Sequence, residues 1–194
     1  MEDPEHEISG VIHALTQSPP LEQQRTIEKY FMPDATFQHP FCRTGSWQGS
    51  RFLIRAIYRW YKIMSPRIDL EIHSVAYDKP NLILYVQLSQ VFRIWVVPFY
   101  RAPVRLVTVL RLERHKGIAS DAVNAVAAPT KYYIAEQNDL YQVNEFVKFV
   151  WPGGHVLVWI WQLWSTLFCL LGALVFWPIS VWEQLTDDDK QMNG

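Results

Sequence analysis

The chain has 194 residues, enough for one ordinary domain and a tail, and 49% of them are apolar, which excludes global disorder. Its formal net charge of −1 provides no bulk attraction to nucleic acid, so we expect no nucleic-acid partner. With two cysteines, Cys42 and Cys169, neither a disulfide framework nor a cysteine-based zinc site can form, and we expect no metal and no cofactor.

Two helical patterns bounded by prolines open the chain, over about residues 4–16 and 21–31. A loop is expected over Asp34–Phe41. A third helix starts after Ser50, a plausible N-cap, and Ser65-Pro66 ends it.

After Pro66 the period of apolar residues changes to two, which predicts strands. The expected strands cover residues 68–77, 82–97, 104–114, 119–127 and 131–141, and a short helix follows over 143–150. Three helices followed by a mostly antiparallel sheet indicate an α+β fold with the helices packed on one face of the sheet.

The segment Val156–Trp182 contains no charged residue and predicts a membrane helix, since about 20 apolar residues span the hydrocarbon core. Tryptophans such as Trp159 and Trp177 lie toward its two ends, where indole rings favour the headgroup region. We therefore expect a domain over 1–150, a transmembrane or membrane-embedded helix over 151–182 and a short acidic tail over 183–194. A buried core helix, or a hairpin in one leaflet, is the alternative.

The first seven residues are acidic and lack the apolar core of a secretory signal. Because the apolar segment lies near the end of the sequence, we expect a tail-anchored protein. Its soluble domain is expected to face the cytosol, at the endoplasmic reticulum or another endomembrane.

Three stretches of sequence suggest a family: the loop YFMPDATFQHP at 30–40, KYYI at 131–134, and DLYQVNEFVKF at 139–149. With the order of elements, they resemble the nuclear transport factor 2-like (SnoaL-like) superfamily, and more narrowly its fungal SigF-like branch, in which a C-terminal hydrophobic segment follows the domain. The resemblance implies a cone-shaped α+β fold with a deep apolar pocket. The superfamily includes isomerases, dehydratases, cyclases and binding proteins, so the fold alone leaves the function open.

The resemblance implies Asp, His and Tyr groups at the pocket, and Asp34 and His39 are catalytic candidates, with loop capping as the alternative. On the third helix, Tyr58, Trp60 and Tyr61 are candidate pocket-lining residues, or else core residues.

His73 shares a predicted strand face with Asp69 and Glu71 and is a third catalytic candidate, although a solvated outer face is the favoured interpretation of these residues. Three polar residues within apolar strands would orient a ligand if they point inward: Gln87, Gln90 and Asn124.

An aromatic cluster occupies the expected hairpin tip, where polar residues are usual. Membrane contact is predicted for Trp95, Phe99, Tyr100 and Arg101 of this tip, together with Trp159 and Trp177. The alternative is that a dimer partner or the N-terminal helices cover the tip.

The leading hypothesis from the sequence is a membrane-anchored domain whose apolar pocket binds a lipophilic small molecule, with membrane lipids as further partners and a homodimer as an option. The second is a cofactor-free isomerase, dehydratase or cyclase acting on a polyketide or terpenoid. The third is a non-catalytic interaction module.

Overall fold

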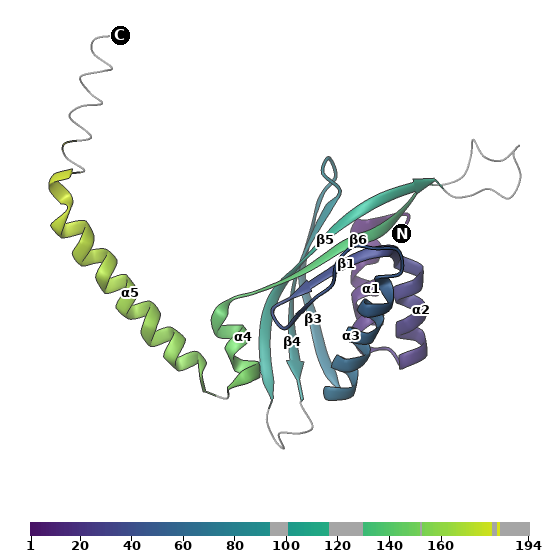
Figure 1. Cartoon of the computed structure of the whole chain (residues 1–194), viewed down its shortest axis with the longest axis horizontal. Helices are drawn as coiled ribbons and strands as arrows, with labels where there is room; N and C mark the ends of the chain where they lie inside the picture. Colours follow the sequence, from purple (N-terminus) through teal and green to yellow (C-terminus); the bar gives the residue numbers. More distant parts are fainter. Residues whose placement is uncertain (94–100, 117–129, 152, 180–181, 183–194) are drawn as a thin grey trace, which may run out of the picture.

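The computed structural model describes residues 1–93, 101–116, 130–151, 153–179 and 182. Among these residues two helices open the chain, a third lies between the second and third of the six strands that form one sheet, and two helices follow the last strand (Figure 1). In chain order the elements are α1 (Pro4–Gln17), α2 (Pro20–Tyr30), β1 (Phe31–His39), β2 (Cys42–Arg43), α3 (Arg51–Met64), β3 (Ile68–Asp78), β4 (Ile83–Phe92), β5 (Ala102–Lys116), β6 (Thr130–Tyr141), α4 (Val143–Val150) and α5 (His155–Val175).

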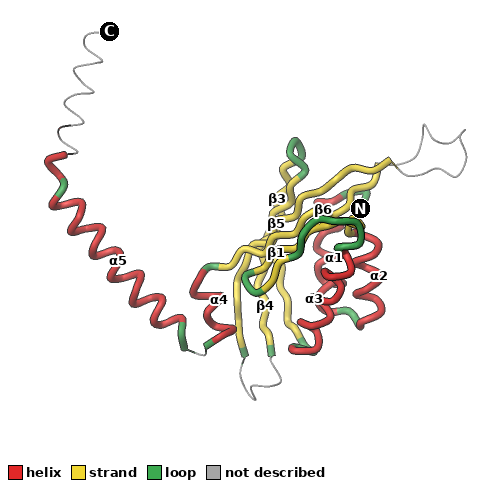
Figure 2. The backbone as a smooth tube through the Cα atoms, in the orientation of Figure 1, coloured by secondary structure: helices red, strands yellow, loops and turns green. Residues whose placement is uncertain are grey.

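The α+β prediction is confirmed, with α1, α2 and α3 gathered on one face of the sheet (Figure 2). The sheet order is β2-β1-β6-β5-β4-β3, and β1 pairs with β6 in parallel while the other neighbours are antiparallel. The parallel pair places β6 in the middle of the sheet, under α3 and beside β1.

The N-terminal helices begin and end where the prolines predict. The Asp3 side chain accepts a hydrogen bond from the His6 backbone N–H (3.3 Å), and Pro4 takes the first turn, where no intrahelical donor is needed. At the start of α3, Ser50 is the N-cap residue as predicted, but its side chain makes no capping hydrogen bond. The Ser50 hydroxyl instead donates to the Ala35 carbonyl (2.7 Å), which ties α3 to β1.

The loop predicted over Asp34–Phe41 is mostly strand β1, so this expectation is wrong. Its inward positions alternate, with Ala35, Phe37 and His39 buried, and its partner residues on β6 lie about 100 residues further along the chain. The two prolines at 33 and 40 favour a loop in the sequence, and the pairing with β6 that stabilises the strand cannot be seen from local sequence.

The remaining strand predictions agree with β3, β4, β5 and β6 to within a few residues, except that β4 ends at Phe92, short of the predicted residue 97. The strand expected over 119–127 and the hairpin tip at 95–100 lie outside the described residues.

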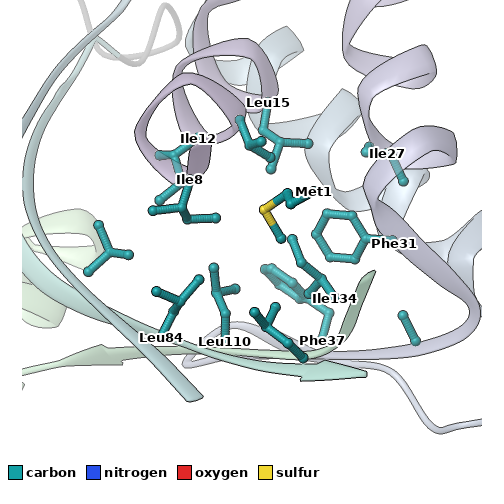
Figure 3. Packing of buried hydrophobic residues seen from close by; sticks show 14 of the residues in the cluster. Met1, Ile8, Ile12, Leu15, Ile27, Phe31, Phe37, Leu84, Leu110 and Ile134 are labelled. Carbon is teal, nitrogen blue, oxygen red and sulfur yellow. The ribbon is translucent and has the colours of Figure 1, made fainter. Parts of the chain in front are cut away.

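The core lies between the helices and the sheet (Figure 3). Ile8 of α1, Ile27 of α2 and Ile54 of α3 are fully buried against inward-facing residues of the strands. Those strand residues include Phe31, Phe37, Leu84, Leu110 and Ile134. Alternation on β4, where Leu84, Val86 and Leu88 are buried, is the period-two pattern that predicted the sheet.

Helix α5 is long and apolar enough to cross a membrane, and none of its residues is buried. It extends away from the domain beyond α4 (Figure 1). The helix ends at Val175, earlier than the predicted end of the apolar segment at Trp182, and the Phe176 N–H bonds to the Gly172 carbonyl (2.9 Å) there. Residues 177–179 are again helical.

Candidate functional site

A cavity of about 50 Å³, the inner cavity, lies between α1, α3 and the sheet. Its apolar wall comes from α1 and from the central strands, and its polar wall comes from α3, β1, β5 and β6. The polar wall contains His39, Tyr58, Tyr61, Thr108, Gln137, Asp139 and Tyr141. Residues from distant parts of the sequence meet here because β6 is flanked by β1 and β5.

Asp139 lies at the centre of this polar wall. Its Oδ1 atom accepts hydrogen bonds from the Thr108 hydroxyl (2.8 Å) and the Gln137 amide (3.0 Å), and its Oδ2 atom accepts a longer bond from the same amide (3.2 Å). The side-chain oxygen Oε1 of Gln137 in turn accepts a hydrogen bond from the Tyr58 hydroxyl (2.9 Å). The Asp139 carboxylate is therefore connected to Tyr58 of α3 through Gln137, and to β5 directly through Thr108.

Burial raises the pKa of Asp139 to about 6, although the bonds from Gln137 and Thr108 act in the opposite direction. The residue keeps some accessible surface and lines the cavity, but the protein around its carboxylate replaces much of the water. A carboxyl with a pKa near neutrality can hold or release a proton at physiological pH, as acid–base chemistry requires.

Two tyrosines accompany this carboxylate in the cavity. Burial is the main cause that raises the pKa of Tyr58 and of Tyr141, and the nearby Asp139 charge adds to it. Both hydroxyls therefore stay protonated at neutral pH and remain able to donate hydrogen bonds.

His39, Tyr61 and Cys42 form a second polar group at the edge of the cavity. The Tyr61 hydroxyl lies 3.2 Å from His39 Nδ1 and 3.2 Å from Cys42 Sγ. The Phe41 backbone N–H also donates to His39 Nδ1 (3.2 Å), so this nitrogen is the acceptor and the ring proton is on Nε2. Burial lowers the pKa of His39 to about 4 and raises the pKa of the Cys42 thiol, so both groups are neutral at pH 7.

A larger apolar depression, the outer groove, has a volume of about 650 Å³ and lies between α3 and the β1–β2 turn. It is lined by apolar residues of α3, among them Leu53, Ala56 and Trp60, and by Phe41 opposite them. Three residues, His39, Tyr61 and Phe92, line both the groove and the inner cavity. The two spaces are therefore neighbours with a common wall, one large and apolar, the other small with one polar wall.

Helix α4 connects this region with α5. The ring of Phe146 on α4 lies 4.7 Å from the ring of Phe41, measured between centroids, and α4 follows directly after the cavity strand β6. The chain thus passes from the cavity to the groove rim and then to the apolar helix without another element between them.

Several residues expected at the pocket do lie there. His39, Tyr58, Tyr61 and Gln90 line the inner cavity, and Trp60 lines the outer groove with 57% of its surface exposed.

Other candidates lie elsewhere. Asp34 is exposed on β1, and its backbone carbonyl accepts from Ser46. His73 lies on the exposed face of the sheet, where its Nε2 pairs with the Ser89 hydroxyl (3.0 Å), and Gln87 is exposed on the same face, paired with Ser74. The pleat of each strand points these three side chains away from the helices. For His73 this is the favoured solvated outer face, whereas Asp34 and Gln87 differ from the expected pocket positions.

The remaining candidates concern the membrane and the unassigned segments. Arg101 is exposed at the start of β5, and Trp159 and Trp177 are exposed on α5 and just after it. Trp95, Phe99, Tyr100 and Asn124 lie outside the described residues. Among the described residues, no group of three His, Cys, Asp or Glu side chains could hold a metal ion.

Sequence reasoning missed Thr108, Gln137, Asp139 and Tyr141 as site residues. A signal was present on β6, where Gln137, Asp139 and Tyr141 alternate and so share one face of the strand. The sequence does not show that this face points toward the helices, since the opposite face of the strand also carries polar residues, Glu136 and Asn138.

Comparison with protein families gives one match: the model described as the SigF NTF2-like domain matches residues 1–179. The match covers the whole α+β domain and continues through α5. No curated protein matches the chain.

Among solved structures, a protein of ketosteroid isomerase-like fold from Catenulispora acidiphila, in complex with trimethylamine, is 15% identical with a TM-score of 0.50. The match covers 71% of this chain and 86% of that one. An LEH-like epoxide hydrolase of Mycobacterium tuberculosis is 14% identical with a TM-score of 0.48, and the match covers 75% of this chain and 90% of that one. A protein described as a putative SnoaL-like polyketide cyclase from Jannaschia is 12% identical with a TM-score of 0.49, and the match covers 74% of this chain and 91% of that one. At these identities the likeness concerns the fold alone.

Proposed function

This chain belongs to the SigF NTF2-like domain family, and we propose that it binds a lipophilic small molecule in the outer groove and inner cavity while α5 holds it at a membrane. The observation that carries the proposal is the arrangement of the two spaces. A groove of about 650 Å³ with a mainly apolar lining adjoins a cavity of about 50 Å³ that has one polar wall.

Sites for small molecules are usually apolar and contain a few polar groups that fix the orientation of the ligand. Here the apolar body of the ligand would lie against Leu53, Ala56 and Trp60 in the groove. Its polar end would replace part of the wall formed by His39 and Tyr61 and reach toward Asp139.

Membrane attachment by α5 is supported by its length, its composition and the absence of buried residues over its 21 positions. A helix with this surface exposes many apolar side chains to water, which lipid would cover at about 25 cal/mol for each Å². The membrane would also concentrate a lipophilic ligand close to the groove.

The test uses the full chain purified in a mild detergent, with bound small molecules extracted and identified by mass spectrometry. Ala56→Trp fills the groove, and Gln87→Trp places the same bulk on the exposed face of the sheet. We expect an apolar molecule to co-purify with the natural chain and with Gln87→Trp, and to fall about tenfold in Ala56→Trp. Equal amounts in all three proteins, or none in any of them, would contradict the proposal.

A second candidate function, cofactor-free proton transfer, is favoured by Asp139 itself. A carboxyl whose pKa is near 6, with the protonated hydroxyls of Tyr58 and Tyr141 in the same cavity, fits the base and the oxyanion donors of an isomerase, dehydratase or cyclase. Incubation of the natural chain with the molecule that co-purifies, in deuterated water, would show exchange of a proton next to its carbonyl. Asp139→Asn would abolish this exchange, and no exchange in the natural chain would exclude the function for that molecule.

The non-catalytic interaction module is the third option. It is favoured only by the small size of the inner cavity, about 50 Å³.

A further inference from the structure

Asp139 is a buried acidic group without a cation paired to it. None of the ion pairs among the described residues includes Asp139, and its hydrogen-bond partners Thr108 and Gln137 are neutral. A buried charge is normally compensated by an opposite charge, because neutral donors recover only part of its hydration energy. At pH 7 the negative charge of the Asp139 carboxylate is therefore only partly compensated by its protein partners.

The groups around it do not supply the missing charge. Titratable side chains near Asp139 come from every element packed against it: Tyr58, Tyr61 and Lys62 of α3, His39 of β1, Cys42 of β2 and Tyr141 of β6. Of these, only Lys62 is charged at neutral pH, and its Nζ donates to the carbonyls of Gln17 (3.0 Å) and Thr16 (3.4 Å) at the end of α1. The lysine therefore interacts with the negative end of that helix.

Aromatic rings provide much of the remaining wall. Phe37 and Tyr58 pack edge to face with centroids 5.8 Å apart, and His39 and Tyr141 do the same at 5.0 Å. The negative faces of aromatic rings attract cations, so a wall of this composition favours a positively charged group over a neutral one. An anionic head group would instead be repelled by Asp139.

The size of the cavity limits what can enter. About 50 Å³ by this measure corresponds to roughly three or four water-sized positions, at about 10–15 Å³ for each. A nitrogen with one or two attached carbons fits this space, and a longer hydrocarbon must remain in the groove. Asp139 Oδ2, which receives only the 3.2 Å bond from Gln137, has room for another donor.

We propose that the ligand of this site is a lipophilic amine, whose protonated nitrogen pairs with Asp139 in the inner cavity while its hydrocarbon chain lies in the outer groove. This inference rests on the proposed function, because it assumes that the groove and cavity hold one molecule. It adds the chemical class of the polar end.

The experiment compares octylamine with 1-octanol, which has the same chain and no charge, by isothermal titration of the full chain at about pH 7.5 and pH 5. We expect octylamine to bind at least about tenfold more tightly than octanol at pH 7.5. The preference should shrink at pH 5, where Asp139 is protonated, since octylamine itself remains charged at both values.

Asp139→Asn keeps the shape of the side chain and removes its charge, so the variant should lose the preference for octylamine over 1-octanol. A direct measure on the natural chain is the ¹³C shift of the Asp139 carboxyl, whose pKa should fall when octylamine binds. Equal binding of amine and alcohol, or an amine preference that survives Asp139→Asn, would overturn this inference and leave the lipophilic site intact. Binding of neither molecule would refute the proposed function as well.

Discussion

The hydroxyl of Tyr61 lies 3.2 Å from Nδ1 of His39, and these two residues, from α3 and β1, separate the inner cavity from the outer groove. The same hydroxyl contacts Cys42 at 3.2 Å, so one phenol joins three elements.

Tyr61→Phe removes this hydroxyl while the ring keeps its place. Because a buried hydrogen bond contributes about 1 kcal/mol, we expect the free energy of unfolding to fall by about 0.5–1.5 kcal/mol in a urea titration. Tyr85→Phe is the matched control, since Tyr85 is 41% exposed on the sheet. A loss of the same size in both variants would show that the contacts with His39 and Cys42 contribute nothing.

Asp139→Asn should stabilise the fold at neutral pH. The pKa of Asp139 is raised from 3.8 to about 6, so the folded chain favours the protonated form. Its contribution to stability is therefore present below about pH 4 and is lost as the pH rises through 6. The variant cannot ionise, and we expect it to be about 1–2 kcal/mol more stable than the natural chain near pH 7.5, measured in urea. A less stable variant at that pH would contradict the sign of the shift.

His39→Phe tests the opposite dependence. Burial lowers the pKa of His39 from 6.5 to about 4, so the neutral form is favoured in the folded chain, and its stabilising contribution is lost as the pH falls from 6.5 to 4. In the variant, the free energy of unfolding should no longer decrease between pH 6.5 and pH 4 through protonation of residue 39 in the unfolded chain. Because Asp139 has the opposite effect over an overlapping range, the measurement is made in the Asp139→Asn background. An unchanged pH dependence there would place the histidine in water.

Ile54→Ala tests whether α3 is fixed to the core. Ile54 is the only described residue of α3 that is fully buried, and its replacement should cost about 2–4 kcal/mol, because the cavity left behind cannot collapse completely. Phe52→Ala on the same helix is the control, since Phe52 is 61% exposed and its loss should cost less than about 0.5 kcal/mol. Thermal unfolding of both variants measures the difference, and equal losses would contradict this packing.

Leu167→Arg places a charge near the middle of α5. A central arginine costs about 2.5–3.5 kcal/mol for insertion into a bilayer, so we expect a large loss of the chain from floated liposomes. Gln87→Arg adds the same charge on the exposed sheet and should leave flotation unchanged. If the two variants float alike, the helix does not hold the chain in lipid.

The sequence predicted the helices and the long strands well because their signals are local. In α1 and β4, the spacing of apolar residues alone indicates both the element and its buried face, as Ile8 and Leu84 illustrate. The missed strand β1 depends on its parallel pairing with β6, and no local pattern encodes a partner about 100 residues away.

The candidate site could be predicted only in part for the same reason. Tyr58 and Tyr61 were found because a helix places them on one side, and His39 because the resemblance drew attention to its loop. Asp139 belongs to the stretch at 139–149 that carries the family resemblance, but nothing local marks it as a site residue. Its role comes from Thr108 and Gln137, which donate to it, and from Tyr58, which donates to Gln137. Burial of a carboxyl is a property of the folded chain, which polar residues on both faces of a strand do not reveal.

The short connection from Tyr141 at the end of β6 to His155 at the start of α5 limits the distance between the domain and the start of the apolar helix. Helix α4 contributes about 12 Å along its eight residues, and the five residues at 142 and 151–154 contribute at most about 18 Å. Were α5 embedded in a bilayer, the site could lie no more than about 30 Å from its surface. A molecule that leaves the site would then be recaptured by the same leaflet before it could diffuse into the bulk phase, and exchange between neighbouring copies would proceed in two dimensions.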